Sequence, residues 1–208
     1  MYNARQVLLL LSVLALSGCA GFGVVESSDP GVKLSDAQIL YSEQQRPLIA
    51  ERLIRQAIGI YEERGDSLGL GHAHRTYAQL LRSPSIVKWE KFYRENGFQN
   101  KSVTFENRFA KSNEYFGKAL EYYKKAETQF REAGQFDALT NVYYNMGYSY
   151  QMVDDRANSC RAFDQSAEAN AENVRRNPNT KVRIPSGYKS FAEVVASAKK
   201  QAGCERAV

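Results

Sequence analysis

The chain has 208 residues, of which 43% are hydrophobic and 25% charged, with a formal net charge of +5 at pH 7. This composition fits one or two small domains with a packed core, and it excludes the collagen-like, low-complexity and disordered classes. Only residues 7–16 are apolar enough to meet a membrane, and this run is too short to span one as a helix.

The N-terminus has the layout of a secretory signal peptide: one early cation, the apolar run and then small residues. Its ending, Leu16-Ser17-Gly18-Cys19, resembles the lipobox of bacterial lipoproteins, in which the cysteine is acylated and becomes the mature first residue. The alternative is an ordinary signal peptide whose cysteine is incidental. Because Ala20 and not Asp follows, the resemblance implies a lipid anchor at Cys19 in the outer membrane of a Gram-negative cell, facing the periplasm.

We therefore expect a signal peptide over residues 1–18, followed by the lipidated cysteine and a flexible tether over residues 19–33. The tether is rich in Gly and Ser and lacks any apolar periodicity. Its reach as a flexible coil is about 20 Å.

Two other cysteines, Cys160 and Cys204, lie in the part of the chain that follows the signal peptide. Paired thiols are typical of an oxidising compartment, so we expect a disulfide that joins the C-terminal end to the repeat domain. The alternative is two unpaired thiols. Metal binding is not expected, because neither cysteine has a histidine nearby and two ligands do not make a site.

The body of the chain repeats itself. Shifting it by 69 residues aligns residues 48–82 with residues 117–151, and Ala50, Ala57, Glu63, Gly65 and Leu70 each meet an identical residue. Each block has helical apolar spacing, a glycine and a second helical run, and strand-like alternation appears nowhere. The sequence therefore predicts an all-α array of helical hairpins.

The spacing within these blocks resembles the tetratricopeptide repeat (TPR). The match is carried by Tyr143-x-x-Met146-Gly147-x-x-Tyr150 and Ser159-x-x-x-Phe163-x-x-Ser166, and Ala119-x-x-x-Tyr123-x-x-Ala126 repeats the second half. The small residues allow two helices to approach closely, and the large ones fill the holes between hairpins. The resemblance implies about three hairpins over residues 34–177, the first incomplete.

An insertion at 83–104 and a basic C-terminal segment at 178–208 complete the predicted organisation. The insertion carries Trp89, Phe92 and Tyr93 on an amphipathic turn, and the last segment ends in a capping helix. Helices are expected at 35–45, 47–64, 67–82, 85–95, 106–132, 135–152, 155–176 and 187–202.

The sequence contains no signature of catalysis. His72 and His74 are the only histidines, and their spacing on one helix points them in different directions, so they cannot jointly hold a metal. His74 falls on a core repeat position, where a packed imidazole is expected. No nucleophile elbow, phosphate-binding loop, zinc motif or dinucleotide fingerprint is present, so we expect no enzyme, no cofactor and no metal.

Protein binding is the function that the resemblance implies, on an inner wall formed by the first helix of each hairpin. That wall should present two sets of side chains, namely His72, Arg75, Gln79 and Arg82, and Asn141, Tyr144, Asn145, Tyr148 and Gln151. The alternative for each residue is a solvated polar face. Tyr144 and Tyr148 are the strongest candidates, because tyrosine offers contact area at low entropic cost. Trp89 is a further candidate contact, unless the insertion packs back on the repeats.

The excess of positive charge lies in residues 170–208, which hold eight Lys or Arg against three Glu. On an envelope protein this segment would meet an anionic envelope component and not nucleic acid. We expect an outer-membrane-anchored adaptor that binds a protein or peptide in a secretion or pilus assembly. The alternative is an immunity lipoprotein that neutralises a type VI secretion toxin in the periplasm. Exposed aromatics on a protruding insertion would favour the alternative.

Overall fold

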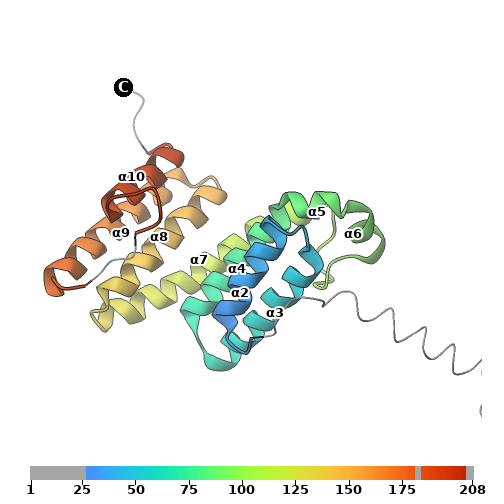
Figure 1. Cartoon of the computed structure of the whole chain (residues 1–208), viewed down its shortest axis with the longest axis horizontal. Helices are drawn as coiled ribbons and strands as arrows, with labels where there is room; N and C mark the ends of the chain where they lie inside the picture. The colour runs from blue at the N-terminus through green and yellow to red at the C-terminus, as the bar shows by residue number, and fades with distance from the viewer. Residues whose placement is uncertain (1–26, 181–183, 205–208) are drawn as a thin grey trace, which may run out of the picture.

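A computed structural model describes residues 27–180 and 184–204, and within these residues all regular secondary structure is helical (Figure 1). The predicted signal peptide and lipidated Cys19 lie outside the described residues. None of the described helices combines the length and the apolarity that crossing a membrane requires.

The helices follow the predicted order. They are α2 (Pro30–Ser42), α3 (Pro47–Arg64), α4 (Ser67–Arg82), α5 (Pro84–Lys88), α6 (Glu90–Asn96), α7 (Arg108–Glu132), α8 (Phe136–Met152), α9 (Arg156–Arg176) and α10 (Phe191–Gln201).

Three helical hairpins form the body of the molecule (Figure 1). They are α2 with α3, α4 with α7, and α8 with α9; α3 also contacts α4, α7 contacts α8, and α10 packs on α9. The predicted all-α hairpin array with a C-terminal capping helix is confirmed. The first hairpin, expected to be incomplete, has both of its helices.

Close approach within two hairpins depends on glycines that face aromatic rings. A Cβ atom at Gly147 of α8 would lie 2.5 Å from the ring of Phe163 in α9, and one at Gly71 of α4 would lie 2.5 Å from Tyr123 in α7. Both rings are completely buried. Small residues thus allow close approach as predicted, but here the large rings fill space between the two helices of one hairpin, whereas the prediction placed them between hairpins.

Two helix starts differ from the prediction because capping residues were overlooked. Asp29 accepts hydrogen bonds from the N–H groups of Gly31 and Val32, so α2 begins at Pro30 instead of residue 35. The tether was predicted to extend to residue 33, but it ends before Pro30, and Lys33 is already buried in α2. Ser190 likewise caps α10 through the N–H of Glu193, so that helix begins at residue 191 and not 187.

The insertion folds back onto the first two hairpins. The helix predicted over 85–95 is in fact two short helices that meet at Trp89, whose indole N–H donates to the carbonyl oxygen of Gln45 at 3.0 Å. Tyr93 and Phe98 stack with their ring centroids 4.2 Å apart, and both are buried in the same core as α2, α3 and α4. Of the two alternatives that the sequence left open, packing back on the repeats holds for Tyr93, whereas Trp89 stays 37% exposed.

A buried carboxylate holds the loop of the insertion in place. Glu51 of α3 is completely buried and accepts hydrogen bonds from the Tyr77 hydroxyl at 2.9 Å and from the N–H groups of Gln99 at 2.9 Å and Asn100 at 3.4 Å. Burial raises the pKa of Glu51, and these hydrogen bonds oppose the rise. The loop backbone thus finds its polar partner inside the repeat domain.

Candidate protein-binding groove

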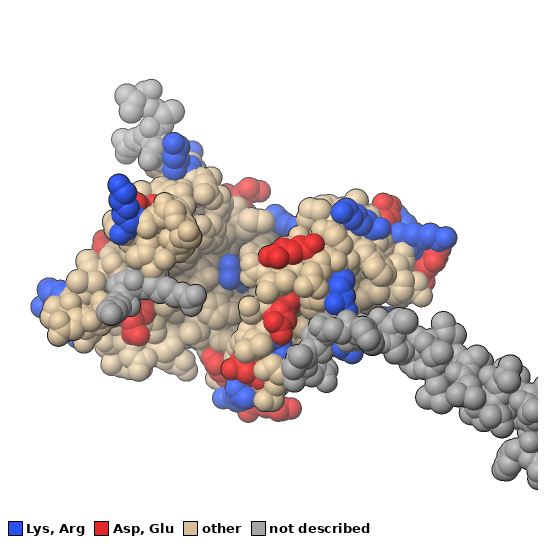
Figure 2. All heavy atoms as spheres, viewed as in Figure 1, with Lys and Arg blue, Asp and Glu red and all other residues tan. Residues whose placement is uncertain are grey.

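A groove runs between α2 and α10, with α4 and α8 beneath it. Figure 2 shows it as a hollow between these two helices, with a basic side chain visible inside. At one end the groove deepens into a cavity of about 470 Å³, between the last turn of α4, the α8–α9 turn and the end of α10. Its lining residues are Arg82, Gln151, Met152, Asp154, Arg156, Gln201 and Ala202.

Arg75 is the central cation of the groove. Its positive charge lowers the pKa of Tyr41 in α2, Tyr123 in α7 and Tyr144 in α8, although burial, the larger effect, raises all three. Its guanidinium is therefore close to three helices at once. Within residues 27–180 and 184–204, its buried Nε has no hydrogen-bond partner and its charge forms no ion pair. A side-chain hydrogen bond joins Arg75 to Tyr123, so the half-buried guanidinium keeps one polar partner but has no carboxylate beside it among these residues.

Arg82 has the opposite character, because its donors are already used. Its Nε donates to the Ser112 hydroxyl at 2.8 Å, and one terminal nitrogen donates to the Met152 carbonyl at 3.1 Å and to Asn113. These bonds join α4 to α7 and α8. Arg82 therefore lines the cavity while fixing its walls.

Tyr144 and Tyr148, expected to be the main contacts for a partner, are half-buried by α10. Their hydroxyls are 3.2 Å apart, and both rings pack edge-on against Phe163 of α9. Tyr144 also lies 5.9 Å, centroid to centroid, from Phe191 of α10. Burial, together with the Tyr148 hydroxyl, raises the pKa of Tyr144. These two side chains are thus partly occupied by the capping helix.

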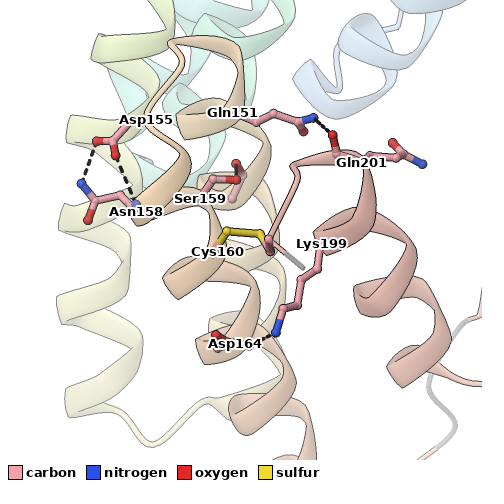
Figure 3. Close-up of a disulfide and its surroundings, with 10 residues drawn as sticks. Gln151, Asp155, Asn158, Ser159, Cys160, Asp164, Lys199 and Gln201 are labelled. Carbon is pink, nitrogen blue, oxygen red and sulfur yellow. Dashed lines mark hydrogen bonds and ion pairs between the residues drawn. A yellow bond between two sulfur atoms is a disulfide. The ribbon is translucent and has the colours of Figure 1, made fainter. Parts of the chain in front are cut away.

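The predicted disulfide between Cys160 and Cys204 is present and fixes α10 against α9 (Figure 3). Two further contacts act beside it. The Lys199 ammonium lies 2.5 Å from a carboxylate oxygen of Asp164, and the Gln151 side chain donates to the Gln201 carbonyl at 3.1 Å. Gln151, predicted to face a partner, is therefore tied to the wall of the groove.

Both histidines pack against α7. His72, predicted to line the inner wall, is hydrogen-bonded through Nδ1 to the Tyr123 hydroxyl at 3.0 Å. His74 is buried beside Tyr115 and Tyr122, with ring centroids 5.7 and 5.3 Å away, which confirms the expected packed imidazole. Burial lowers the pKa of each to about 4.

The remaining predicted side chains lie at the open part of the groove. Gln79 is half-buried one turn beyond Arg75, Asn145 is half-buried on α8, and Asn141 is exposed. The amide nitrogens of Asn141 and Asn145 donate to backbone carbonyls of their own helix, at 3.2 and 2.7 Å. Arg75, Gln79 and Asn145 are therefore the groove residues best placed to meet a ligand.

Sequence reasoning missed the contribution of α10 to the cavity, through Gln201 and Ala202. The signal that could have found it is the cysteine pair, because a bridge from Cys204 to α9 brings the preceding residues near the α8–α9 turn. Trp89 lies on the insertion, beyond the end of α4 and outside the residues that line the cavity.

Comparisons with protein families, with curated proteins and with solved structures found no match to the chain. The groove, the disulfide and the sequence motifs are therefore the basis for assigning a function.

Proposed function

We propose that this protein is a TPR-like lipoprotein of the Gram-negative envelope. It is anchored to the outer membrane through Cys19, faces the periplasm and acts as an adaptor that binds a protein segment in an envelope assembly. The segment lies in the groove between α2 and α10.

The compartment is supported by two separate features of the chain. The first is the lipobox-like ending at Cys19, and the second is the Cys160–Cys204 disulfide, a type of bond that persists in oxidising compartments. Several acyl chains on one residue would hold the protein stably at the membrane, since a single chain binds only marginally.

Binding in the groove is supported chiefly by Arg75. A half-buried guanidinium with an unpaired N–H offers both a hydrogen bond and a positive charge to a polar or acidic group of a partner. Gln79, one turn after Arg75 on α4, and Asn145, next to Tyr144 on α8, are half-buried and offer further hydrogen-bonding groups. A rigid wall made by α10 limits the reorganisation that binding requires.

The adaptor function is preferred over the immunity function because of the insertion. Exposed aromatics on a protruding element were the feature that favoured a toxin-blocking role; Tyr93 and Phe98 are buried in the core, and of the aromatic residues 89, 92, 93 and 98 only Trp89 is exposed.

Site-specific photo-crosslinking in the native host tests groove binding. A photoreactive residue at Gln79 of the full chain should give adducts of discrete mass, whereas one at the exposed Thr128 of α7 should give none. Arg75→Gln should weaken the adduct about tenfold while leaving the melting temperature unchanged or raised. Equal labelling from both positions, or an adduct that survives Arg75→Gln intact, would contradict the proposal.

Metabolic labelling with a palmitate analogue tests the anchor independently. Wild type should be labelled and Cys19→Ala should not, while Cys204→Ala should keep its label. An unlabelled wild type would disprove the lipid anchor without affecting groove binding.

A further inference from the structure

The insertion exposes a small apolar surface where α5 meets α6. Val87, at the end of α5, is 51% exposed, and Trp89, at the junction, is 37% exposed. The indole N–H of Trp89 already has its partner in the Gln45 carbonyl, so the part of the ring that faces outward has no hydrogen bond to lose. This surface is separate from the groove.

Two cations without ion pairs accompany these apolar side chains. Lys88 and Lys91 are exposed, and neither ammonium lies within ion-pair distance of an acid in the described part of the chain. By contrast, Arg94 pairs with Glu90 at 2.7 Å and also with Glu106. One exposed carboxylate, Glu95, follows one turn after Lys91, and Figure 2 shows basic side chains projecting at this end of the molecule, with acidic ones beside them.

We infer that the insertion tip, defined as Val87, Lys88, Trp89 and Lys91, docks on the surface of an anionic phospholipid bilayer. Tryptophan is enriched at the membrane–water interface, where its ring meets the headgroup region. Lysines beside it extend their ammonium groups to lipid phosphates while their methylene stems cover apolar surface. The tip combines both features on one exposed element.

The docking rests on the proposed lipid anchor, because four side chains bind a bilayer only weakly by themselves. An anchored chain has a high effective concentration at the membrane, so that even a weak contact is populated. Ten residues lie between Cys19 and Pro30, and this stretch can span at most about 35–40 Å. Helix α2 is about 20 Å long and is followed by Gln45, which contacts Trp89, so the tether is long enough for the tip to reach the bilayer that holds the lipid.

Trp89 is the only tryptophan of the chain, so its fluorescence reports on this surface alone. The native lipidated protein is reconstituted into phosphatidylethanolamine vesicles with or without phosphatidylglycerol, using brominated acyl chains as quenchers. Flotation of the vesicles measures anchoring in the same samples. We expect a blue shift and strong quenching of Trp89 only when phosphatidylglycerol is present.

Charge reversal provides the matched comparison. Lys88→Glu with Lys91→Glu should reduce the docked population about tenfold or more, since each lysine near an anionic surface contributes about a fivefold increase in binding. Lys124→Glu with Lys125→Glu, an exposed pair on α7, should quench like wild type. High salt should weaken the quenching in parallel.

Each other result has a defined meaning. A chain that floats with the vesicles while its Trp89 stays unquenched overturns docking and leaves the anchor standing. A chain that does not float overturns both. If the emission maximum of Trp89 is unchanged by vesicles and shifts only when envelope proteins are added, the tip binds a protein partner. This result also overturns the inference.

Discussion

The insertion and the C-terminal helix are both additions to the three hairpins, and both pack back onto them, yet they are attached by different means. The insertion contributes Ile86, Tyr93, Phe98 and Val103 to the large core that it shares with α2, α3 and α4. Helix α10 buries Val194, Val195 and Ala198; two of these, Val195 and Ala198, join a small cluster around Phe163, and Phe191 packs partly buried against it.

The difference shows how the type of attachment follows the amount of apolar surface available. A segment with four buried apolar side chains is held by packing. The buried N–H groups of its loop also require hydrogen-bond acceptors, and the Glu51 carboxylate accepts from them. An eleven-residue helix is only marginally stable by itself, and α10 buries few apolar groups. The disulfide therefore supplies stability that packing alone does not give to α10.

The largest expected effect comes from removing the covalent bond. Cys160→Ser with Cys204→Ser should cost about 4 kcal/mol by the chain-entropy estimate for a loop of this length. Because α10 has little other attachment, the loss should appear first as local opening. Hydrogen exchange should accelerate at the amides of Val194 and Val195 before it does in α4. Equal acceleration in both helices would contradict a locally weak α10.

The insertion should respond instead to loss of its polar partner. Glu51→Ala leaves the Tyr77 hydroxyl and two backbone N–H groups unpaired in the core, at a cost of about 3 kcal/mol. Glu51→Gln keeps one acceptor and should cost about 1–2 kcal/mol, as measured by urea unfolding. Equal losses would mean that the hydrogen bonds contribute little.

The Glu51→Gln difference should also depend on pH. Burial raises the pKa of Glu51, so its folded-state contribution is fully present below the usual value of 4.5 and is lost as pH rises through the folded pKa. The stability gap between wild type and Glu51→Gln should therefore be widest near pH 4 and narrow toward pH 7.

An intermediate effect is expected where α8 and α9, the platform for α10, touch most closely. Gly147→Ala should destabilise the protein by about 2 kcal/mol, because the new methyl group meets the ring of Phe163. Gly117→Ala in α7 is the control, since its methyl group meets nothing within 4 Å; it should stabilise the protein by about 0.5–1 kcal/mol. Thermal unfolding of both variants measures the contrast, and a neutral Gly147→Ala would mean that the two helices can separate freely.

The last expected effect concerns the histidines, both of which lie on α4, and it develops only at acid pH. Burial lowers the pKa of His72 and His74 to about 4, so below the usual value of 6.5 the unfolded chain binds protons that the folded chain does not. Stability should fall by about 2.5 kcal/mol for each histidine as pH drops from 6.5 to 4.

Replacing both histidines with Gln should flatten this part of the urea-midpoint profile. Hydrogen exchange in α10 should have the same pH dependence in this variant as in wild type, since α10 contains no histidine. A histidine-dependent change in α10 would show that the two regions are coupled.

Much of the fold could be predicted from local patterns in the sequence. Apolar spacing and the 69-residue repeat located every hairpin helix, since amphipathic periodicity is a property of neighbouring residues. The disulfide could be predicted because the chain has only two cysteines besides Cys19, the cysteine of the lipobox-like motif. Starts of α2 and α10 were missed where a single capping side chain, Asp29 or Ser190, extended or shortened the helix.

Tertiary structure alone decided which of the predicted groove residues remain available. Repeat position placed Tyr144, Arg82 and Arg75 on one wall, but α10 covers the tyrosine, α7 and α8 accept hydrogen bonds from Arg82, and Arg75 keeps a free N–H within the described residues. Availability depends on contacts between residues far apart in the chain, which no local period encodes. For the same reason, the buried Glu51 gave no sign in the sequence that it would hold the insertion in place.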